Sequence, residues 1–461
     1  MRTPLARLLG VLSPAAWLVV VLAIGSSIGV ALVRVPPPRG LQFWIFAIQH
    51  RPYYLRAVAA WNHRHPDEQV QLTLINGNSL QQRMMSSFFS GTPIADVLEV
   101  ERTIVGPAFA GPLDQVGFVD LTDRLRRQGL LEAVNAPSFS PWTSRGRIFG
   151  IPHDVHPVLL AYRADLVAAA GIDVSHIATW DDYFRVMAPL MQGRDGSVER
   201  YLINGWPSDL YTCEILLLQA GGALFDARER PTLNAPANAR FIARLATWYT
   251  GPHRVARSLD YFSASGHQML QSGLTVGLLV PDWYVGLILK PEIPGLAGKL
   301  KLMPLPAWEP GGRRTSAWGG TMLAIARSSP RPRAAWDFAQ YLYLDPAGAI
   351  ALFRGDGIVT PVKSNWGNPA YDEPDPYFCG QPVGRLFVDE ASHVPLRTSS
   401  PYNQLAISAF DNCLIDVTAY AARTGRFDPG ALVPEAQRLL DAAQAEVRAQ
   451  IGRNVFLSVQ P

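Results

Sequence analysis

The residues best suited to do chemistry in this sequence lie between two prolines. His153, Asp154 and His156 occur between Pro152 and Pro157. Imidazole and carboxylate groups can bind a metal ion, exchange protons during hydrolysis, or hydrogen-bond to a polar ligand. Proline fixes its own φ and favours extended backbone at the preceding residue, so we predict a stiff, extended crossover that presents these side chains to a cleft. The alternative is a loop whose histidines bond to solvent or to nearby backbone.

The spacing of the two histidines argues against a metal site. Side chains three residues apart on an extended chain point to opposite faces, so we expect the imidazoles of His153 and His156 to point apart. Zinc-binding helices place two histidines four residues apart, as in HExxH, and the sequence has no such motif. We therefore predict no bound metal and no cofactor.

Motifs of phosphate binding and nucleophilic catalysis are missing from the sequence. No GxGxxG follows a predicted strand, and there is no P-loop and no GxSxG. Acidic residues are numerous, but nothing in the sequence directs two of them at one bond. We predict a binding protein without enzymatic activity. The alternative is a glycoside or metal-dependent hydrolase that uses the two histidines and Asp154.

The positive signal is an aromatic residue beside a polar one at several predicted strand ends. The chain has 12 Trp and 15 Tyr. Sugars place their C–H faces on aromatic rings, and their hydroxyls hydrogen-bond to carboxylates, imidazoles and amides, so a cleft with this lining suits a sugar. Burial or plain solvation is the competing explanation for each residue. The candidate ligand-binding residues are Trp44, Glu99, Glu101, Asp154, His156, Asp209, Tyr211, Trp283, Trp318, Tyr402 and Asn403.

Alternating strands and helices are predicted to position these residues. The nearly continuous apolar run 41–48 indicates a strand buried on both faces, and 70–75 and 95–101 indicate two more, with helices between them. This βαβαβ order predicts a parallel sheet, whose ligands collect at the carboxyl ends of the strands. Further strands are predicted at 201–204, 273–280, 300–305 and 321–326.

Size and composition set the broad class. With 461 residues the chain exceeds what one core usually holds, so we expect two lobes. The chain has 48% hydrophobic and 17% charged residues, which indicates a globular protein. A net charge of +3 without a block of Lys and Arg argues against nucleic-acid binding. Three cysteines allow at most one internal disulfide.

The N-terminal 40 residues are predicted to anchor the protein outside the cytoplasm. Arg2 and Arg7 precede the uncharged stretch 15–33, whose 19 residues can span a bilayer as a helix. No small-residue cleavage site follows and no cysteine lies nearby to carry a lipid, so we predict an uncleaved signal anchor. The alternative is a cleaved signal sequence. The prolines at 36–38 form a stiff spacer.

The order of three motifs resembles a known family. They are the run IPHDVHPVLLAYRADL from Ile151, the run GLTVGLLVPDW from Gly273, and a strand followed by a helix from Trp318. This order, over residues 41–455, resembles the family 1 extracellular solute-binding proteins of bacterial ABC importers, in the maltose-binding-protein-like cluster of sugar binders.

The resemblance implies an α/β fold of two lobes with a hinge and an interlobe cleft, which closes on its ligand as in periplasmic binding proteins generally. It implies a first lobe of residues 41–154 and 309–362 and a second, more helical lobe of residues 155–308 and 363–461. The implied partners are a mono- or oligosaccharide and the permease subunits, and the implied state is a monomer. A sensory module that presents its closed form to a signalling receptor is an alternative.

The resemblance also implies roles for individual residues. Trp283 matches the tryptophan that stacks on sugar rings in the family. His156 matches the contact after the first crossover, where maltose binders usually have an acid. Asp209 and Tyr211 match the pair that opens a helix of the second lobe. The late aromatic contact falls at Tyr402 or at the adjacent Asn403.

Overall fold

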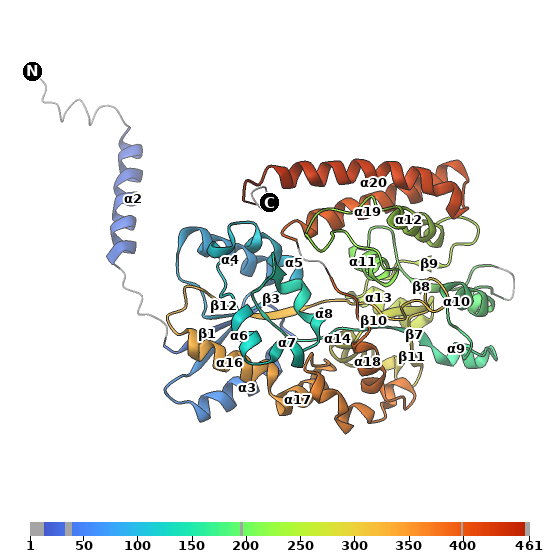
Figure 1. The fold of residues 1–461 in the computed structure, drawn as a ribbon, viewed down its shortest axis with the longest axis horizontal. Coiled ribbons are helices and arrows are strands. Elements are labelled where there is room, and N and C mark those ends of the chain that lie inside the picture. Colours follow the sequence, from blue (N-terminus) through green and yellow to red (C-terminus); the bar gives the residue numbers. More distant parts are fainter. Residues whose placement is uncertain (1–12, 33–38, 194–196, 398–399, 457–461) are drawn as a thin grey trace, which may run out of the picture. The chain divides into compact units, whose positions relative to one another are not determined.

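The computed structural model describes residues 13–32, 39–193, 197–397 and 400–456, and the chain divides into two compact units, 1–40 and 41–461 (Figure 1). In the first unit a helix, α2 (Pro14–Leu32), forms in the stretch predicted to be an anchor, and it contains no charged residue.

The first sheet of the second unit has the strand order β2-β1-β3-β12-β6. Strand β1 (Leu41–Ile45) runs parallel to β2 (Val70–Leu74) and to β3 (Val97–Glu101). Strand β12 (Thr321–Ile325) is antiparallel to β3 and to the short strand β6 (Ile151–Pro152). The predicted parallel βαβαβ unit is thus confirmed, and β12 and β6 extend it into a mixed sheet. We call the elements around this sheet the first lobe.

Alternate residues of β12 face the two layers that cover this sheet, as the two-residue period of a strand requires. Leu323 and Ile325 pack in one apolar cluster, which also holds residues of α3 (Arg51–Arg64) and α16 (Pro332–Leu344). Met322 and Ala324 pack in the other, which holds residues of α4 (Gly77–Ser90). The other helices of this lobe are α5 (Arg102–Val105), α6 (Thr122–Arg127), α7 (Leu130–Ala133), α8 (Ala136–Phe139) and α17 (Pro346–Asp356), and β4 (Thr143–Ser144) pairs with β5 (Arg147–Ile148).

The second sheet has the order β11-β7-β10-β8-β9. Strand β7 (Val158–Arg163) is antiparallel to β11 (Leu300–Pro304) and to β10 (Thr275–Pro281). Strand β8 (Tyr201–Asn204) is parallel to β10 and to β9 (Ala256–Arg257). The elements around this sheet form the second lobe. The chain enters it between β6 and β7 and leaves it between β11 and β12, where Pro157 and Ala317 pair as an isolated bridge.

Long helices dominate the second lobe. In Figure 1, α12 (Pro236–Tyr249), α19 (Asn403–Thr424) and α20 (Pro429–Gly452) lie together along one side of this lobe, and they pack against one another. By length and composition α19 could cross a membrane, but its apolar residues belong to the core of the lobe. The remaining helices are α9 (Ala164–Ala169), α10 (Trp180–Met187), α11 (Leu210–Gln219), α13 (Ala264–Ser272), α14 (Asp282–Tyr284), α15 (Lys290–Glu292) and α18 (Val383–Ala391).

Candidate functional site

A cavity of about 400 Å³ opens between the two lobes and is lined by residues of both. Helix α5 brings the first lobe to it directly after β3, and α11 brings the second lobe to it shortly after β8. Both helices therefore start near the carboxyl ends of sheet strands, where ligands of α/β proteins collect. The ring of Tyr211 lines the cavity and remains 42% exposed. The polar side chains around it belong to Asn78, Gln81, Arg102, Thr103, Glu214, Arg397, Ser400, Asn403 and Gln404.

Two of the predicted acidic residues cap the helices that border this cavity. The carboxylate of Glu101 accepts a hydrogen bond from the backbone N–H of Thr103, at 2.7 Å, at the start of α5. Asp209 does the same at the start of α11, where it accepts from Tyr211 N at 3.1 Å and from the Thr212 hydroxyl at 2.6 Å. Burial raises the pKa of both carboxyls. These acids hold the helices that carry Arg102 and Tyr211.

A buried ion pair joins the lobes across the cavity. The guanidinium of Arg102, from α5, contacts the carboxylate of Glu214, from α11, and both side chains are almost fully buried. Burial disfavours the charge on Arg102, but Glu214 and Glu101 outweigh it and raise the pKa of the guanidinium. The pair therefore connects the first residue of α5 to the N-terminal half of α11.

Arg397 is a second buried cation at this cavity. Its Nη1 donates to the carbonyl of Gly319 at 2.5 Å, and its Nη2 donates to the carbonyl of Ala317. Burial, and then the nearby charge of Arg102, lower the pKa of Arg397 to about 9. The side chain also lines a smaller cavity of about 20 Å³ that is lined by Asp154 and His156. Arg397 therefore connects the crossover segment to the interlobe cavity.

The two histidines of the crossover bond to the same carboxylate. Oδ2 of Asp154 lies 3.0 Å from Nδ1 of His153 and 2.7 Å from Nε2 of His156, whose Nδ1 lies 2.7 Å from Asp282. The prediction that the imidazoles point apart is wrong, because His156 has a φ of 54° and the backbone is not extended there. All four side chains are buried.

The charges of this network are set by its pairings. Burial disfavours a charged imidazole, but Asp154 and Asp282 outweigh it and raise the pKa of His156 to about 9. Burial likewise opposes the charge of Asp154, but His156 and His153 hold the pKa of that carboxyl below its ordinary value. Burial lowers the pKa of His153. The imidazolium of His156 is thus held between the carboxylates of Asp154 and Asp282, and this pairing stabilises the charges in the buried network.

Two of the three predicted tryptophans, Trp283 and Trp318, lie against this network and pack together. Trp283 donates its indole N–H to the carbonyl of Trp318 at 3.0 Å, and its ring is parallel to that of Phe262 at 6.3 Å between centroids. Gly319 permits the close approach, because a Cβ there would lie 2.9 Å from both His156 and Trp283. Trp283 is half-buried.

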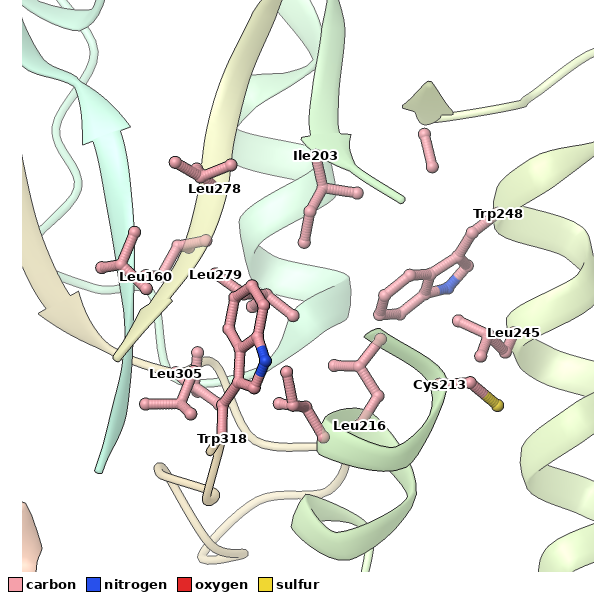
Figure 2. Close-up of a cluster of buried hydrophobic side chains, with 14 of the residues drawn as sticks. Leu160, Ile203, Cys213, Leu216, Leu245, Trp248, Leu278, Leu279, Leu305 and Trp318 are labelled. Atoms are coloured by element: carbon pink, nitrogen blue, oxygen red, sulfur yellow. The ribbon is translucent and has the colours of Figure 1, made fainter. Parts of the chain in front are cut away.

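Trp318 lies on the crossover that leads to β12, and its indole packs into the core of the second lobe. It is 3% exposed, and Figure 2 shows its indole among Leu279, Leu305 and Leu216. One side of the cluster reaches the cavity, because the Tyr211 ring lies 5.8 Å from that of Trp318. Trp318 can therefore support the ring that faces the cavity, without itself lining it.

Three other predicted residues lie away from the interlobe cavity. Glu99 is fully buried and accepts from Nδ1 of His50 at 2.6 Å and from the Tyr54 hydroxyl at 2.7 Å, so it organises the interior of the first lobe. Trp44 lines a separate surface hollow with Arg83. Tyr402 is half-buried against the second-lobe core, directly before Asn403, which does line the interlobe cavity.

Sequence reasoning missed three charged residues at the cavity. A signal was present for Arg102, which directly follows the predicted strand end at Glu101, and for Glu214, which lies three residues after Tyr211 on the same helical face. Arg397 lies in a loop, and nothing local in the sequence marks it.

The described residues offer no ready metal centre. Among them, no group of three or more His, Cys, Asp or Glu side chains is arranged to hold a metal ion. Cys213, Cys379 and Cys413 are all free. That the protein works without a metal stays a prediction.

Comparison with known proteins identifies the family. The model of the bacterial extracellular solute-binding proteins matches residues 47–349. An arabinooligosaccharide-binding protein of Halalkalibacterium halodurans is 25% identical over 87% of this chain and 89% of its own. The lactose-binding protein of Rhizobium radiobacter is 24% identical over 74% of this chain and 78% of its own.

Solved structures share the fold. A family 1 extracellular solute-binding protein superposes with a TM-score of 0.71 at 21% identity, over 88% of this chain and 100% of that one. The sugar-binding protein MalE of Xanthomonas citri gives a TM-score of 0.72 at 20% identity, over 90% and 99% of the two chains. The two sheets described above are those of this two-lobe α/β fold. The chain belongs to the bacterial extracellular solute-binding protein family.

Proposed function

We propose that this protein is the carbohydrate-binding component of a bacterial ABC importer. It captures a sugar or oligosaccharide in the interlobe cavity and delivers it to the permease. The observation that carries the proposal is the half-exposed ring of Tyr211 among amide and charged side chains of both lobes. Such a lining offers a stacking surface together with hydrogen-bonding groups, as a saccharide needs. The names of the arabinooligosaccharide- and lactose-binding relatives support the same class of ligand.

Within the site, we assign the direct contacts to side chains that line the cavity. Tyr211 stacks on a sugar ring, and Asn403 hydrogen-bonds to its hydroxyls. Asp154 and His156 line the adjoining small cavity, which shares Arg397 with the interlobe cavity. Four of the other predicted residues position the side chains that line the cavity without lining it themselves. They are Glu101, Asp209, Trp283 and Trp318.

The lobes close on the ligand about the crossovers between the sheets. The first lobe comprises residues 41–154 and 309–362, and the second comprises 155–308 and 363–461. The crossovers run side by side, since Trp318 N–H donates to the carbonyl of His156 and Val158 N–H donates to that of Ser316. A saccharide that touches both lobes favours the closed form, because only that form provides every contact.

The N-terminal residues 1–40 hold the protein at the outer face of the membrane. The 19 residues of α2 extend for about 28 Å as a helix, close to the roughly 30 Å thickness of a hydrocarbon core. The protein then works as a monomer outside the cytoplasm, next to the permease.

The protein works by binding and not by turnover. Both ring nitrogens of His156 are engaged, by Asp154 and by Asp282, so this imidazole has no free nitrogen for acid–base work. Hydrolysis and a sensory role have no comparable observation in their favour.

A thermal-shift screen of the full-length protein in detergent tests the proposal. Mono- and oligosaccharides are compared with amino acids and short peptides. A saccharide at about a hundred times its Kd adds roughly 2.7 kcal/mol to the free energy of unfolding and raises Tm accordingly. Stabilisation by peptides or amino acids alone would contradict the proposal, and turnover of nitrophenyl glycosides would favour the hydrolase.

A further inference from the structure

Two arginines that line the interlobe cavity are almost completely buried. Arg102 is 9% exposed and Arg397 is 8% exposed. Arginine is seldom buried to this extent without anionic partners, because the guanidinium stays charged and loses its hydration. The positive charge of these two side chains therefore influences which ligands the cavity can bind.

Among the described residues, only one of the two cations has an ion-pair partner. Glu214 pairs with Arg102. Glu101 is occupied by capping α5, and burial raises its pKa. Among the described residues Arg397 forms no ion pair, and its guanidinium donates only to the backbone carbonyls of Ala317 and Gly319. Glu214, Glu101 and Asp154 act on the charge of Arg397 only through space, and none of them accepts a hydrogen bond from it.

The same two arginines also have unused donors. Within the part of the chain that the structure describes, Nε of Arg102 and Nε of Arg397 are buried without a hydrogen-bond acceptor. The hydroxyls of a neutral sugar can accept such bonds, but they cannot neutralise the charge. A carboxylate or a phosphate does both, and its paired oxygens fit the guanidinium fork.

We propose that the saccharide bound in this cavity carries an anionic group, a uronate carboxylate or a phosphate ester, which Arg397 binds together with Arg102. This inference rests on the proposed function and specifies its ligand class. The neutral part of the saccharide lies on Tyr211, and the amides of Asn78 and Asn403 bind its hydroxyls. Glu214 is the residue that opposes the anion, because its carboxylate already occupies one side of Arg102.

Calorimetric titration of the full-length protein in detergent with matched ligands tests the inference. Galacturonate is compared with galactose, digalacturonate with galactobiose, and glucose 6-phosphate with glucose. We expect an acidic member to bind at least about tenfold more tightly than its neutral counterpart, which corresponds to one charge-assisted hydrogen bond gained. Preference for the uronates or for the phosphate ester identifies which anion the site takes.

Variants of the cavity charges separate an anion site from an ordinary polar lining. Arg397→Gln should remove the preference for the acidic ligand, measured as the ratio of the acidic to the neutral affinity. Glu214→Gln retains a side chain that can bond to Arg102 but removes the competing charge, so it should raise the ratio of the acidic to the neutral affinity several-fold. Glu214→Gln remains informative if Arg397→Gln does not fold. Arg126→Gln, on an exposed surface, is the matched control.

The outcomes distinguish this inference from the proposed function. Equal or tighter binding of the neutral members, or an unchanged acid preference in both cavity variants, would overturn the inference and leave the proposed function in place. If neither acidic nor neutral saccharides bind, the proposed function fails and the inference fails with it.

Discussion

Arg102 and Glu214 form a buried ion pair that connects the two lobes across the cavity. The pair lies where α5 and α11 face each other, so it exists only when the lobes are as close as they are here. It therefore contributes to the arrangement of the lobes in this structure, and a ligand that enters the cavity lies against it.

Removal of one partner of this pair should be costly. We expect Glu214→Met to lower the free energy of unfolding by about 3–5 kcal/mol, because it leaves Arg102 buried without its counter-ion. The double variant Arg102→Met/Glu214→Met should recover most of that loss. Chemical denaturation of the single and double variants measures the coupling. The exposed pair Arg126–Asp123 is the control, and Asp123→Ala should change stability by less than about 1 kcal/mol. Additive effects of the two methionine substitutions would show that the pair does not form in solution.

The pairing of His156 predicts a loss of stability at alkaline pH. The pKa of His156 is raised from 6.5 to about 9 in the folded protein, so its stabilising contribution is complete below pH 6.5 and is lost as the pH rises through 9. A shift of this size corresponds to roughly 3 kcal/mol. Urea denaturation at pH values between these limits checks the slope.

The variant His156→Gln provides the control for that pH dependence. It cannot be protonated, so it should be less stable than the wild type at pH 6.5 and should lose little further stability up to pH 9. If the wild type and this variant lose stability in parallel over that interval, another group titrates and the assignment to His156 is wrong.

Trp283 should contribute to stability through its contacts with Trp318 and Phe262. We expect Trp283→Ala to lower the free energy of unfolding of the ligand-free protein by about 2–4 kcal/mol, since the ring is half-buried. Melting curves together with ligand titration separate this from the stacking role that the family resemblance implies. Unchanged stability with weakened saccharide binding would show that the ring meets the ligand.

The N-terminal helix should remain on the mature protein. The motive is the uncharged 19-residue helix α2, with no small-residue cleavage site in the sequence after it. Intact-mass measurement of the protein extracted from membranes checks this. A mature N-terminus beyond residue 33, or recovery of the protein in the soluble fraction, would contradict the anchor.

Much of the fold could be predicted from local pattern. Apolar runs and two-residue alternation located β1, β2, β3, β8, β10, β11 and β12 to within a few residues. Most of these strands are buried and stand out as apolar runs, whereas the edge strand β2 is largely exposed and stands out by its alternation. The antiparallel entry of β12 beside β3 is a long-range pairing of Thr321 with Glu101, and it has no local signal.

The site was harder to predict from the sequence, because its contacts also join residues far apart in the chain. Glu99 lies near the end of a predicted strand, as a ligand contact would, but His50 and Tyr54, at the start of α3 about 50 residues earlier, occupy its carboxylate. Arg397 reaches the cavity from a loop of the second lobe and bonds to Ala317 and Gly319 at the crossover. The positive φ of His156 was likewise not predicted, because the preference of a residue before proline for extended backbone takes no account of tertiary contacts.

Titration calorimetry with a saccharide found by the thermal-shift screen, on the wild type and on Tyr211→Ala, tests most directly whether the interlobe cavity binds sugar. Tyr211 presents its ring to the cavity, so the substitution should weaken binding by about 0.5–1.5 kcal/mol, or roughly two- to tenfold in Kd, with little change in the stability of the ligand-free protein. Phe89→Ala, an exposed aromatic residue that does not line the cavity, should leave the affinity unchanged. Unaltered saccharide affinity in Tyr211→Ala would contradict the account and place the ligand elsewhere.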